Sequence, residues 1–354
     1  MARHPRGAAC KAMIEQAVVR LLVLGPTAGA AAVVCSALLA LLRPWLARYA
    51  MAQPNARSSH RAPTPQGGGI AVVGAASVVA AGAIALSSPL QDDAGQMLAL
   101  AAMTALLAVV GAIDDVRTLP AAARLALQCI AVMVVLATLP HDFRVLPQAP
   151  WWVERAALLF VGIWFVNLVN FMDGIDWMTV AEVVPVSGAL VLLGLSGTMA
   201  LVPSIIAAAL LGATIGFAPF NKPVAKVFLG DVGSLPIGLL LGWLLLKLAG
   251  SGHLAAALIL PLYYLLDASI TLVRRIARGE RFWQAHRSHF YQRATDNGFS
   301  VPAIIARVIA VNLALAALAL ATIAADHLVV SLIALAAGIA IVAWLLRTFG
   351  RAKR

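Results

Sequence analysis

The residues best suited to chemistry are carboxylates near the ends of apolar segments. Asp114, Asp115, Asp173, Asp176 and Asp231 each lie where an apolar run of the chain ends or begins. An ionised acid at the centre of a bilayer costs about 2.5 to 3.5 kcal/mol even on a lenient insertion scale, so acids kept near a membrane need a reason. Five acids expected at one membrane surface predict a cation site.

The segment NLVNFMDGIDW, at 167–177, spaces two amides and two carboxylates three residues apart: Asn167, Asn170, Asp173 and Asp176. In a helix the first three fall within an arc of about 120°. Such oxygen donors suit Mg²⁺, which binds few carboxylates and completes its shell with water and phosphate oxygens. The alternative is a set of hydrogen bonds between membrane helices, and it fits Asn167 better than Asp173.

Two further segments carry acids at expected helix ends. GAIDDVRTLP, at 111–120, holds Asp114 and Asp115, which point about 100° apart and share a ligand only if the helix ends there. Solvated loop acids are the alternative for this pair. KVFLGDVGS, at 226–234, places Asp231 before a new span, where free backbone N–H groups favour a nearby anion.

The loop segment HRSHFYQR, at 286–293, combines basic and aromatic side chains. Its candidate substrate-binding residues are His286, Arg287 and His289. A zinc site would need more cysteine or histidine nearby, whereas arginine, histidine and aromatic rings suit a nucleotide diphosphate.

The segment PNARSSHRAPTPQGGG, at 54–69, is a second basic loop, and it ends in a glycine triplet. Its candidate substrate-binding residues are Arg57, His60 and Arg61. The loop either holds phosphates or forms a flexible turn.

The elements that must position these residues are membrane helices. With 62% hydrophobic and 12% charged residues, the 354-residue chain is too apolar for a soluble protein. We expect an all-α polytopic membrane protein with one transmembrane domain, 18–346, between an N-terminal extension, 1–17, and a basic tail, 347–354. Eleven spans are expected at 18–42, 67–87, 95–113, 121–140, 151–170, 178–196, 200–219, 232–249, 254–273, 302–324 and 328–346.

Positive charge indicates the orientation of these spans. Most lysines and arginines fall in the loops on the side shared by the five acids, which predicts that this side is cytoplasmic and the N-terminus lies opposite. Because the net charge of +11 is accounted for by these loops, it does not indicate nucleic acid. Anionic membrane lipids and phosphorylated substrates are the expected partners.

Taken in order, these motifs resemble the polyprenyl-phosphate N-acetylhexosamine-1-phosphate transferases, glycosyltransferase family 4. The resemblance rests on PNARSSH with PTPQGGG, AIDD, NLVNFMDGID, KVFLGDVGS, Asp267 ahead of Arg274-Arg275, and HRSHFYQR. The last motif is similar to the O-antigen and enterobacterial-antigen type. The resemblance implies transfer of a sugar-1-phosphate from a UDP-N-acetylhexosamine to undecaprenyl phosphate at the cytoplasmic face of the bacterial inner membrane, with release of UMP and with Mg²⁺, or Mn²⁺ in its place, as cofactor.

The resemblance also implies residue roles. Asp231 resembles the principal metal ligand, with Asn170 or Asp173 beside it, and Asp114 resembles a base for the lipid phosphate. The remaining implied roles are supporting acids (Asp115, Asp176), groups facing the nucleotide diphosphate (His286, Arg287, His289) and a structural acid (Asp267). Trp177 departs from the family pattern, because many members have glycine there.

Two other functions compete with this reading. A polytopic transporter would use acids near the membrane midplane, yet most acids lie at one face, and only Glu182 and Asp267 fall well inside expected spans. A membrane phosphatase acting on lipid diphosphates would share the metal and the basic loops, and only its products would separate it. The sequence leaves the sugar and the formation of a homodimer open.

Overall fold

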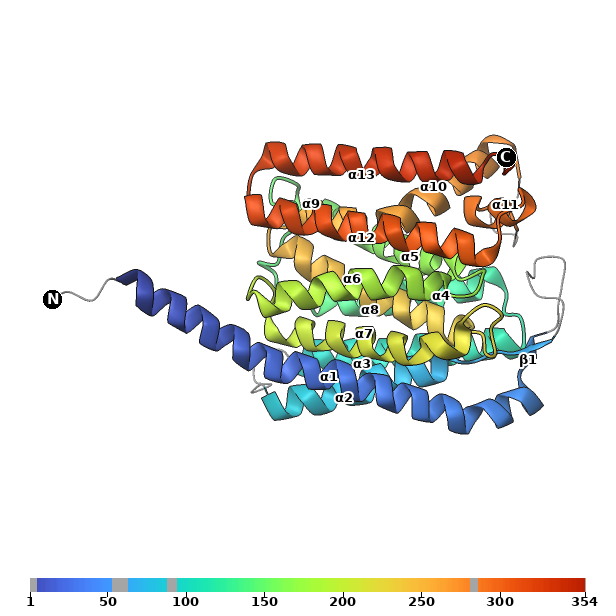
Figure 1. Cartoon of the computed structure of the whole chain (residues 1–354), viewed down its shortest axis with the longest axis horizontal. Coiled ribbons are helices and arrows are strands. Elements are labelled where there is room, and N and C mark those ends of the chain that lie inside the picture. The colour runs from blue at the N-terminus through green and yellow to red at the C-terminus, as the bar shows by residue number, and fades with distance from the viewer. Residues whose placement is uncertain (1–4, 53–62, 88–93, 281–285, 354) are drawn as a thin grey trace.

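The computed structural model describes residues 5–52, 63–87, 94–280 and 286–353, with side chains from residue 15 onward. These residues form a bundle of long helices that lie side by side (Figure 1). The long helices are α1 (Pro5–Tyr49), α2 (Gly69–Ser87), α3 (Ala94–Val116), α4 (Ala121–Ala137), α5 (Trp151–Met172), α6 (Met178–Leu195), α7 (Leu201–Asn221), α8 (Asp231–Gly250), α10 (Leu262–Ala277), α12 (Val301–Ala325) and α13 (Leu328–Phe349). The shorter elements are β1 (Met51–Ala52), β2 (Thr64–Pro65), α9 (Leu254–Ile259) and α11 (Phe290–Asp296).

The helices confirm the all-α polytopic prediction. Among the described residues, nine helices are long and apolar enough to cross a membrane, and α4 is a shorter apolar helix. The prediction of one continuous span at 254–273 is wrong, because α9 and α10 divide it at Leu260 and Pro261. Proline lacks the N–H that would continue the helix, so Pro261 explains the break.

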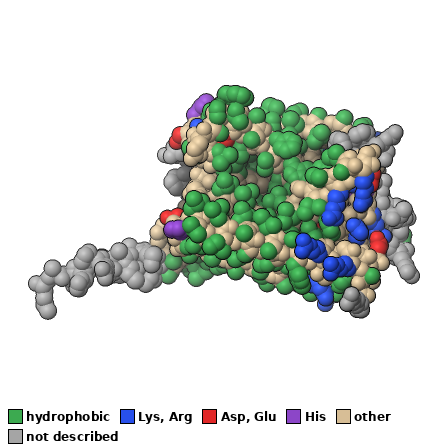
Figure 2. Space-filling model, turned by 90° about the horizontal axis from the view of Figure 1, so that it is seen from above, with side chains coloured by type: hydrophobic (Ala, Val, Ile, Leu, Met, Phe, Trp, Pro, Cys, Tyr) green, Lys and Arg blue, Asp and Glu red, His purple; other side chains and the backbone are tan. Residues whose placement is uncertain are grey.

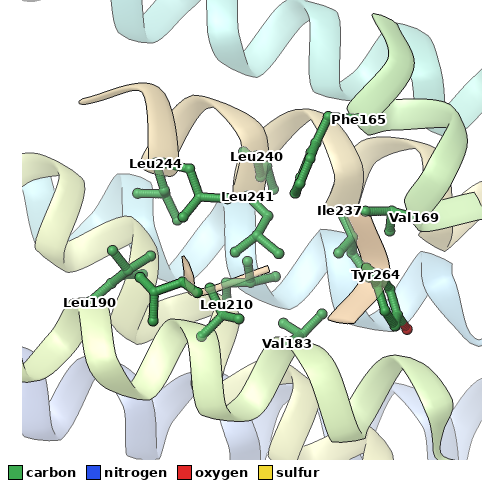
Figure 3. Packing of buried hydrophobic residues seen from close by; sticks show 14 of the residues in the cluster. Phe165, Val169, Val183, Leu190, Leu210, Ile237, Leu240, Leu241, Leu244 and Tyr264 are labelled. Carbon is green, nitrogen blue, oxygen red and sulfur yellow. The ribbon is translucent and has the colours of Figure 1, made fainter. Parts of the chain in front are cut away.

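Helix α8 lies at the centre of the bundle. In the most apolar stretch of α8, 83% of the residues are buried, compared with 22% in the corresponding stretch of α13. Figure 3 shows Leu240, Leu241 and Leu244 of α8 packed among side chains of α5, α6, α7 and α10. The position of its first turn is therefore determined by the packing around it.

Small residues let neighbouring helices approach closely, as is common in membrane proteins. A Cβ on Gly212 of α7 would lie 2.0 Å from the carbonyl oxygen of Ala28, and one on Gly216 would lie 2.3 Å from that of Ala32. These two glycines pack α7 directly against the backbone of α1.

The helix ends that carry the predicted acids meet at one end of the bundle. We call it the site end: the last turns of α3 and α5 and the first turns of α8 and α11. The short sheet and the end of α13 lie there too, whereas the start of α1 lies at the other end (Figure 1). Lys and Arg side chains gather at this end on the face drawn in Figure 2. For the described residues, the expected meeting of the acid segments at one end of the bundle is confirmed.

Candidate active site

The start of α8 is held by a carboxylate from α3. The backbone N–H groups of Asp231 and Val232 donate to Asp115 Oδ1 (2.8 Å) and Oδ2 (3.1 Å), and the Gln66 amide also donates to Oδ1. The first N–H groups of a helix have no partner within the helix, and a negative charge there also interacts well with the helix dipole. Asp115 therefore joins the end of α3 to the start of α8.

Glycines allow the same helix ends to touch. A Cβ on Gly111 would lie 2.2 Å from the carbonyl oxygen of Asp231, and one on Gly69 would lie 2.2 Å from the Cα of Gly233. Gly68 and Gly69 donate their N–H groups to the carbonyl oxygens of Phe228 and Leu229, both at 2.8 Å. For these two glycines the contacts indicate close backbone packing, not a phosphate cradle.

The side chain of Asp231 lies in a cluster of polar groups from four helices. Its Oδ1 accepts a hydrogen bond from Asn170 Nδ2 of α5 (2.8 Å), and the same Nδ2 donates to Ser234 Oγ (2.9 Å). The carboxyl group of Asp114, at the end of α3, is adjacent. Arg124 of α4 is ion-paired with Asp114 and lies 3.6 Å from Asp231 Oδ2. We call these five residues the acid centre.

Arg124 is the member that the sequence analysis missed. It follows the Asp114-Asp115 loop and resembles an ordinary basic residue at a membrane surface. One feature of the sequence could have indicated its role. Arg124 lies in the first turn of the helix that follows the acid pair, so its long side chain reaches the carboxylates of Asp114 and Asp231.

Asp173 and Asp176 follow α5 and differ in role. Asp173 is half-buried and accepts a hydrogen bond from Thr179 of α6. Burial, together with the nearby carboxylates of Asp115 and Asp176, raises the pKa of Asp173 to about 7. Asp176 is only 6% exposed, and its Oδ2 accepts the N–H of Ala225 at 3.0 Å. Asp176 therefore anchors the loop before α8, whereas Asp173 is more open.

Asn167 connects two helices. Its Nδ2 donates to Gln128 Oε1 of α4 (2.6 Å) and to the carbonyl oxygen of Ile163 (2.9 Å). These contacts match the helix-packing alternative for this residue. Its predicted contact with substrate stays a prediction.

Trp177 has the backbone conformation that glycine favours. Its φ is 63°, in the left-handed region. The backbone N–H donates to Asn221 Oδ1 (2.8 Å) and the indole N–H donates to the carbonyl oxygen of Ala218 (2.6 Å). These two bonds hold the loop after α5 against the end of α7, and the conformation explains why glycine suits this position.

The start of α11 is held by a second carboxylate. Asp267 of α10 is fully buried and accepts the N–H groups of Phe290 (3.0 Å) and Tyr291 (3.3 Å) and a bond with His289 Nδ1 (3.3 Å). The Tyr291 hydroxyl donates to the carbonyl oxygen of Phe171 (2.9 Å). Asp267 thus has the structural role that was expected, and α11 is attached to the last turn of α5.

The three candidate nucleotide residues of this loop differ in exposure. His289 is 3% exposed, and its ring stacks on that of His286, with the centroids 4.9 Å apart. Arg287 donates to Thr295 Oγ1 (2.8 Å) and lies 3.3 Å from Asp296. His286 and Arg287 are half-buried, so they are more accessible to a ligand than His289. The other candidates, Arg57, His60 and Arg61, lie outside the described residues.

The donors of the acid centre fit a hard divalent cation. Within the described ranges, no three His, Cys, Asp or Glu side chains converge as in a closed metal site. The carboxylates of Asp114 and Asp231 and the hydroxyl of Ser234 are oxygen donors that leave most of a shell to water and substrate, as Mg²⁺ or Mn²⁺ requires. The Asn170 amide would add its oxygen only after turning, because its Nδ2 faces Asp231 and Ser234 here. Asp173 lies one turn beyond Asn170. Its place in the metal set stays a prediction.

An apolar groove runs along the bundle below the acid centre. It has a volume of about 160 Å³ and lies between α4, α5, α8, α9 and α10. Val166 and Gly238 line one part of it, about one helical turn from Asn170 and two turns from Asp231, and Ala249 and Leu254 line its far part. The groove is suited to a hydrocarbon chain.

Comparison with known proteins finds a family model and several relatives that match parts of the chain. Residues 97–249 match the family model described as Glycosyl transferase family 4, and they include Asp114, Asp173 and Asp231. The chain is 26% identical to the probable undecaprenyl-phosphate N-acetylglucosaminyl 1-phosphate transferase of Bacillus subtilis, with 71% of each chain covered. It is 28% identical to the decaprenyl-phosphate N-acetylglucosaminephosphotransferase of Mycobacterium leprae, also over 71% of each. A shorter match, 36% identical over 33% of this chain and 34% of the other, is to the phospho-N-acetylmuramoyl-pentapeptide-transferase of Streptococcus pyogenes.

Proposed function

The chain belongs to the polyprenyl-phosphate hexosamine-1-phosphate transferases of glycosyl transferase family 4, and from this premise we propose that it transfers N-acetylhexosamine-1-phosphate from a UDP-sugar to undecaprenyl phosphate. The observation that carries the proposal is the acid centre, where Asp114 and Asp231 lie side by side at the site end and Arg124 is ion-paired with both. Such a centre suits a reaction between two phosphate anions.

The reaction exchanges one phosphoanhydride bond for another. An oxygen of the lipid phosphate attacks the phosphorus that bears the sugar, the bond to the nucleoside phosphate breaks, and UMP leaves with its electron pair. Because bond types are conserved, the protein mainly has to align two anions and offset their repulsion. A divalent ion held by Asp231 with Asn170 and Ser234 would supply positive charge there.

Asp114 is better placed to hold charge than to remove a proton. It accepts the N–H of Leu119 at 2.6 Å and the guanidinium of Arg124, and both contacts stabilise its ionised form. A phosphate monoester has its second pKa near 6, so the lipid phosphate is already largely dianionic at neutral pH. We therefore give Asp114 the role of orienting Arg124 and the metal, in place of the implied base.

The apolar groove supports a lipid acceptor. A polyprenyl phosphate whose head lies at the acid centre would place its chain along the groove towards the far end of the bundle. The names of both longer relatives contain a polyprenyl phosphate, which is the same class of acceptor.

Charge supports the orientation of the site. The site end carries most of the described basic side chains, including those of α4, α10, α11 and the C-terminus, which favours a site at the cytoplasmic face of the bacterial inner membrane. The HRSHFYQR segment supports a product used for an O-antigen type of lipopolysaccharide glycan, although one relative acts on a muramoyl-pentapeptide.

The test is a product assay on purified protein. The protein is incubated with undecaprenyl phosphate, Mg²⁺ and a panel of UDP-N-acetylhexosamines, and UMP and the lipid product are followed by chromatography. We expect UMP only when lipid and metal are both present, and none with EDTA. Release of inorganic phosphate from a lipid diphosphate, with no UMP from any UDP-sugar, would contradict the proposal and support a phosphatase.

A further inference from the structure

Arg124 has a special position among the basic residues of the site end. Its guanidinium Nη1 bonds Asp114 Oδ2 and lies 3.6 Å from Asp231 Oδ2, while its side chain is 23% exposed. Among the described residues, Arg124 is the one cation ion-paired with either carboxylate. It therefore stands at the oxygen atoms that a divalent ion would use.

The guanidinium also has donors to offer. Arginine carries five N–H groups in a fixed fork, and Nη1 makes the bonds to the acids. Its Nε and Nη2 have no hydrogen-bond partner within the described part of the chain. These two nitrogen atoms are not buried, so a ligand can reach them. They are suited to the oxygens of a phosphate, which arginine binds through two parallel bonds.

Arg124 therefore affects metal binding in opposite directions, depending on whether a phosphate is bound. Without a phosphate, a divalent ion at Asp231 lies next to a positive guanidinium, and like charges repel. A phosphate that lies between the ion and Arg124 turns this repulsion into two attractions. We propose that Arg124 couples metal binding to phosphate binding: it weakens the affinity for metal alone and strengthens it when a substrate phosphate is present.

The inference rests on the proposed function only in taking a phosphate as ligand. That phosphate belongs either to the lipid acceptor or to the nucleotide, and the two have the same chemistry. Because coupling between two ligands is reciprocal, it can be measured from the metal alone.

The experiment measures Mn²⁺ binding to the full-length protein by the electron paramagnetic resonance signal of free Mn²⁺. Titrations are made alone, with UMP and with undecaprenyl phosphate in micelles, and matching samples without protein correct for direct binding of Mn²⁺ to these phosphates. For the wild type we expect at least one phosphate to tighten Mn²⁺ binding about tenfold or more. Arg124→Gln should bind Mn²⁺ alone about tenfold more tightly and lose most of that tightening.

The phosphate whose effect is lost identifies the ligand of Arg124. Arg124→Lys keeps the charge but loses the fork, so it should bind metal alone as weakly as the wild type and retain part of the coupling. Arg117→Gln removes an exposed arginine of the same loop and is the matched control, expected to change neither quantity. Thermal melting shows that each variant is folded.

Weaker Mn²⁺ binding by Arg124→Gln, or unchanged tightening by both phosphates, would overturn the inference and leave Arg124 as a plain counter-ion. The result is independent of the transferase assay. If no UDP-sugar reacts but the coupling is present and depends on Arg124, the reaction is wrong and the inference stands.

Discussion

The starts of α8 and α11 are built in the same way but present different surfaces. In each, a carboxylate from an earlier helix accepts two backbone N–H groups of the first turn, Asp115 at α8 and Asp267 at α11. At α11 the acid is fully buried under His289, whereas at α8 the next carboxylate, Asp231, has 27% of its side chain exposed beside Arg124. The same capping contact thus supports one closed junction and one open centre.

An acid in a motif is therefore not by itself a catalytic residue. Asp115, Asp176 and Asp267 bind backbone N–H groups and hold the chain in place. Asp114 and Asp231 lie next to each other beside Arg124, although Asp114 also accepts the N–H of Leu119, and Asp173 accepts a hydrogen bond from the side chain of Thr179. Substitutions in the two groups should therefore have different signatures.

The largest effect is expected for Asp231→Asn. The amide keeps an acceptor for Asn170 but loses the charge that binds a metal, so we expect kcat to fall by about 1000-fold or more with little change in melting temperature. UMP release and thermal melting in detergent measure both. Asp142→Asn, in an exposed loop at the other end, is the control. Activity above a tenth of that of the wild type would show that catalysis does not require Asp231.

A smaller loss of activity, joined to a loss of stability, is expected for Asp115→Ala. Two N–H groups at the start of α8 would lose their partners, at about 1 to 3 kcal/mol each. We expect a lower melting temperature and a fall of about 100-fold in kcat, because Asp231 loses its fixed position. A variant that is inactive but as stable as the wild type would indicate instead that Asp115 acts directly on substrate.

Asp267→Ala should break the closed junction. We expect a similar loss of melting temperature but only about a tenfold loss of activity, seen mainly as a higher KM for the UDP-sugar, because α11 carries the loop with His286 and Arg287. His289→Ala should change the same KM in the same direction and by less. Equal increases in KM for the lipid and the UDP-sugar would contradict a role of this loop in binding the nucleotide.

The smallest effect concerns pH. Because the folded protein raises the pKa of Asp173 from 3.8 to about 7, the folded state keeps a proton that the unfolded state has lost between these values. Stability contributed by this group therefore falls as pH rises from about 4 to about 7. In EDTA, Asp173→Asn should melt at a higher temperature than the wild type at pH 8, and the difference should shrink towards pH 5. A difference that is the same at both pH values would contradict the raised pKa.

Much of the fold follows from local patterns. Apolar runs long enough for a bilayer predict the helices and their alternation, and so place the acid segments at one end. The break in the expected span 254–273 could have been predicted from Pro261, but the continuous run of hydrophobic residues indicated a single helix. The left-handed backbone of Trp177 was signalled only by the family pattern that the resemblance implied, which has glycine there.

The site was predicted less completely. Asn170 was expected beside Asp231 at a metal; the two residues are joined by a 2.8 Å hydrogen bond, and the shared metal stays a prediction. Arg124 was missed, because one arginine near a membrane surface has the same local pattern as any other. The different roles of Asp114 and Asp115 were also missed, since the two acids are adjacent in the chain, but Asp115 binds the start of α8 whereas Asp114 binds Leu119 of the next loop and Arg124 of α4.

By itself the sequence determined a membrane bundle with acids and basic loops at one end, because lipid leaves the backbone no partner but its own helix, and charges must stay near water. Only the tertiary structure decided which carboxylate caps a helix and which lies in the open centre. The physical reason is distance along the chain. The bond between Asp115 and the N–H of Asp231 joins residues 116 positions apart, and it forms only when α3 and α8 are packed together.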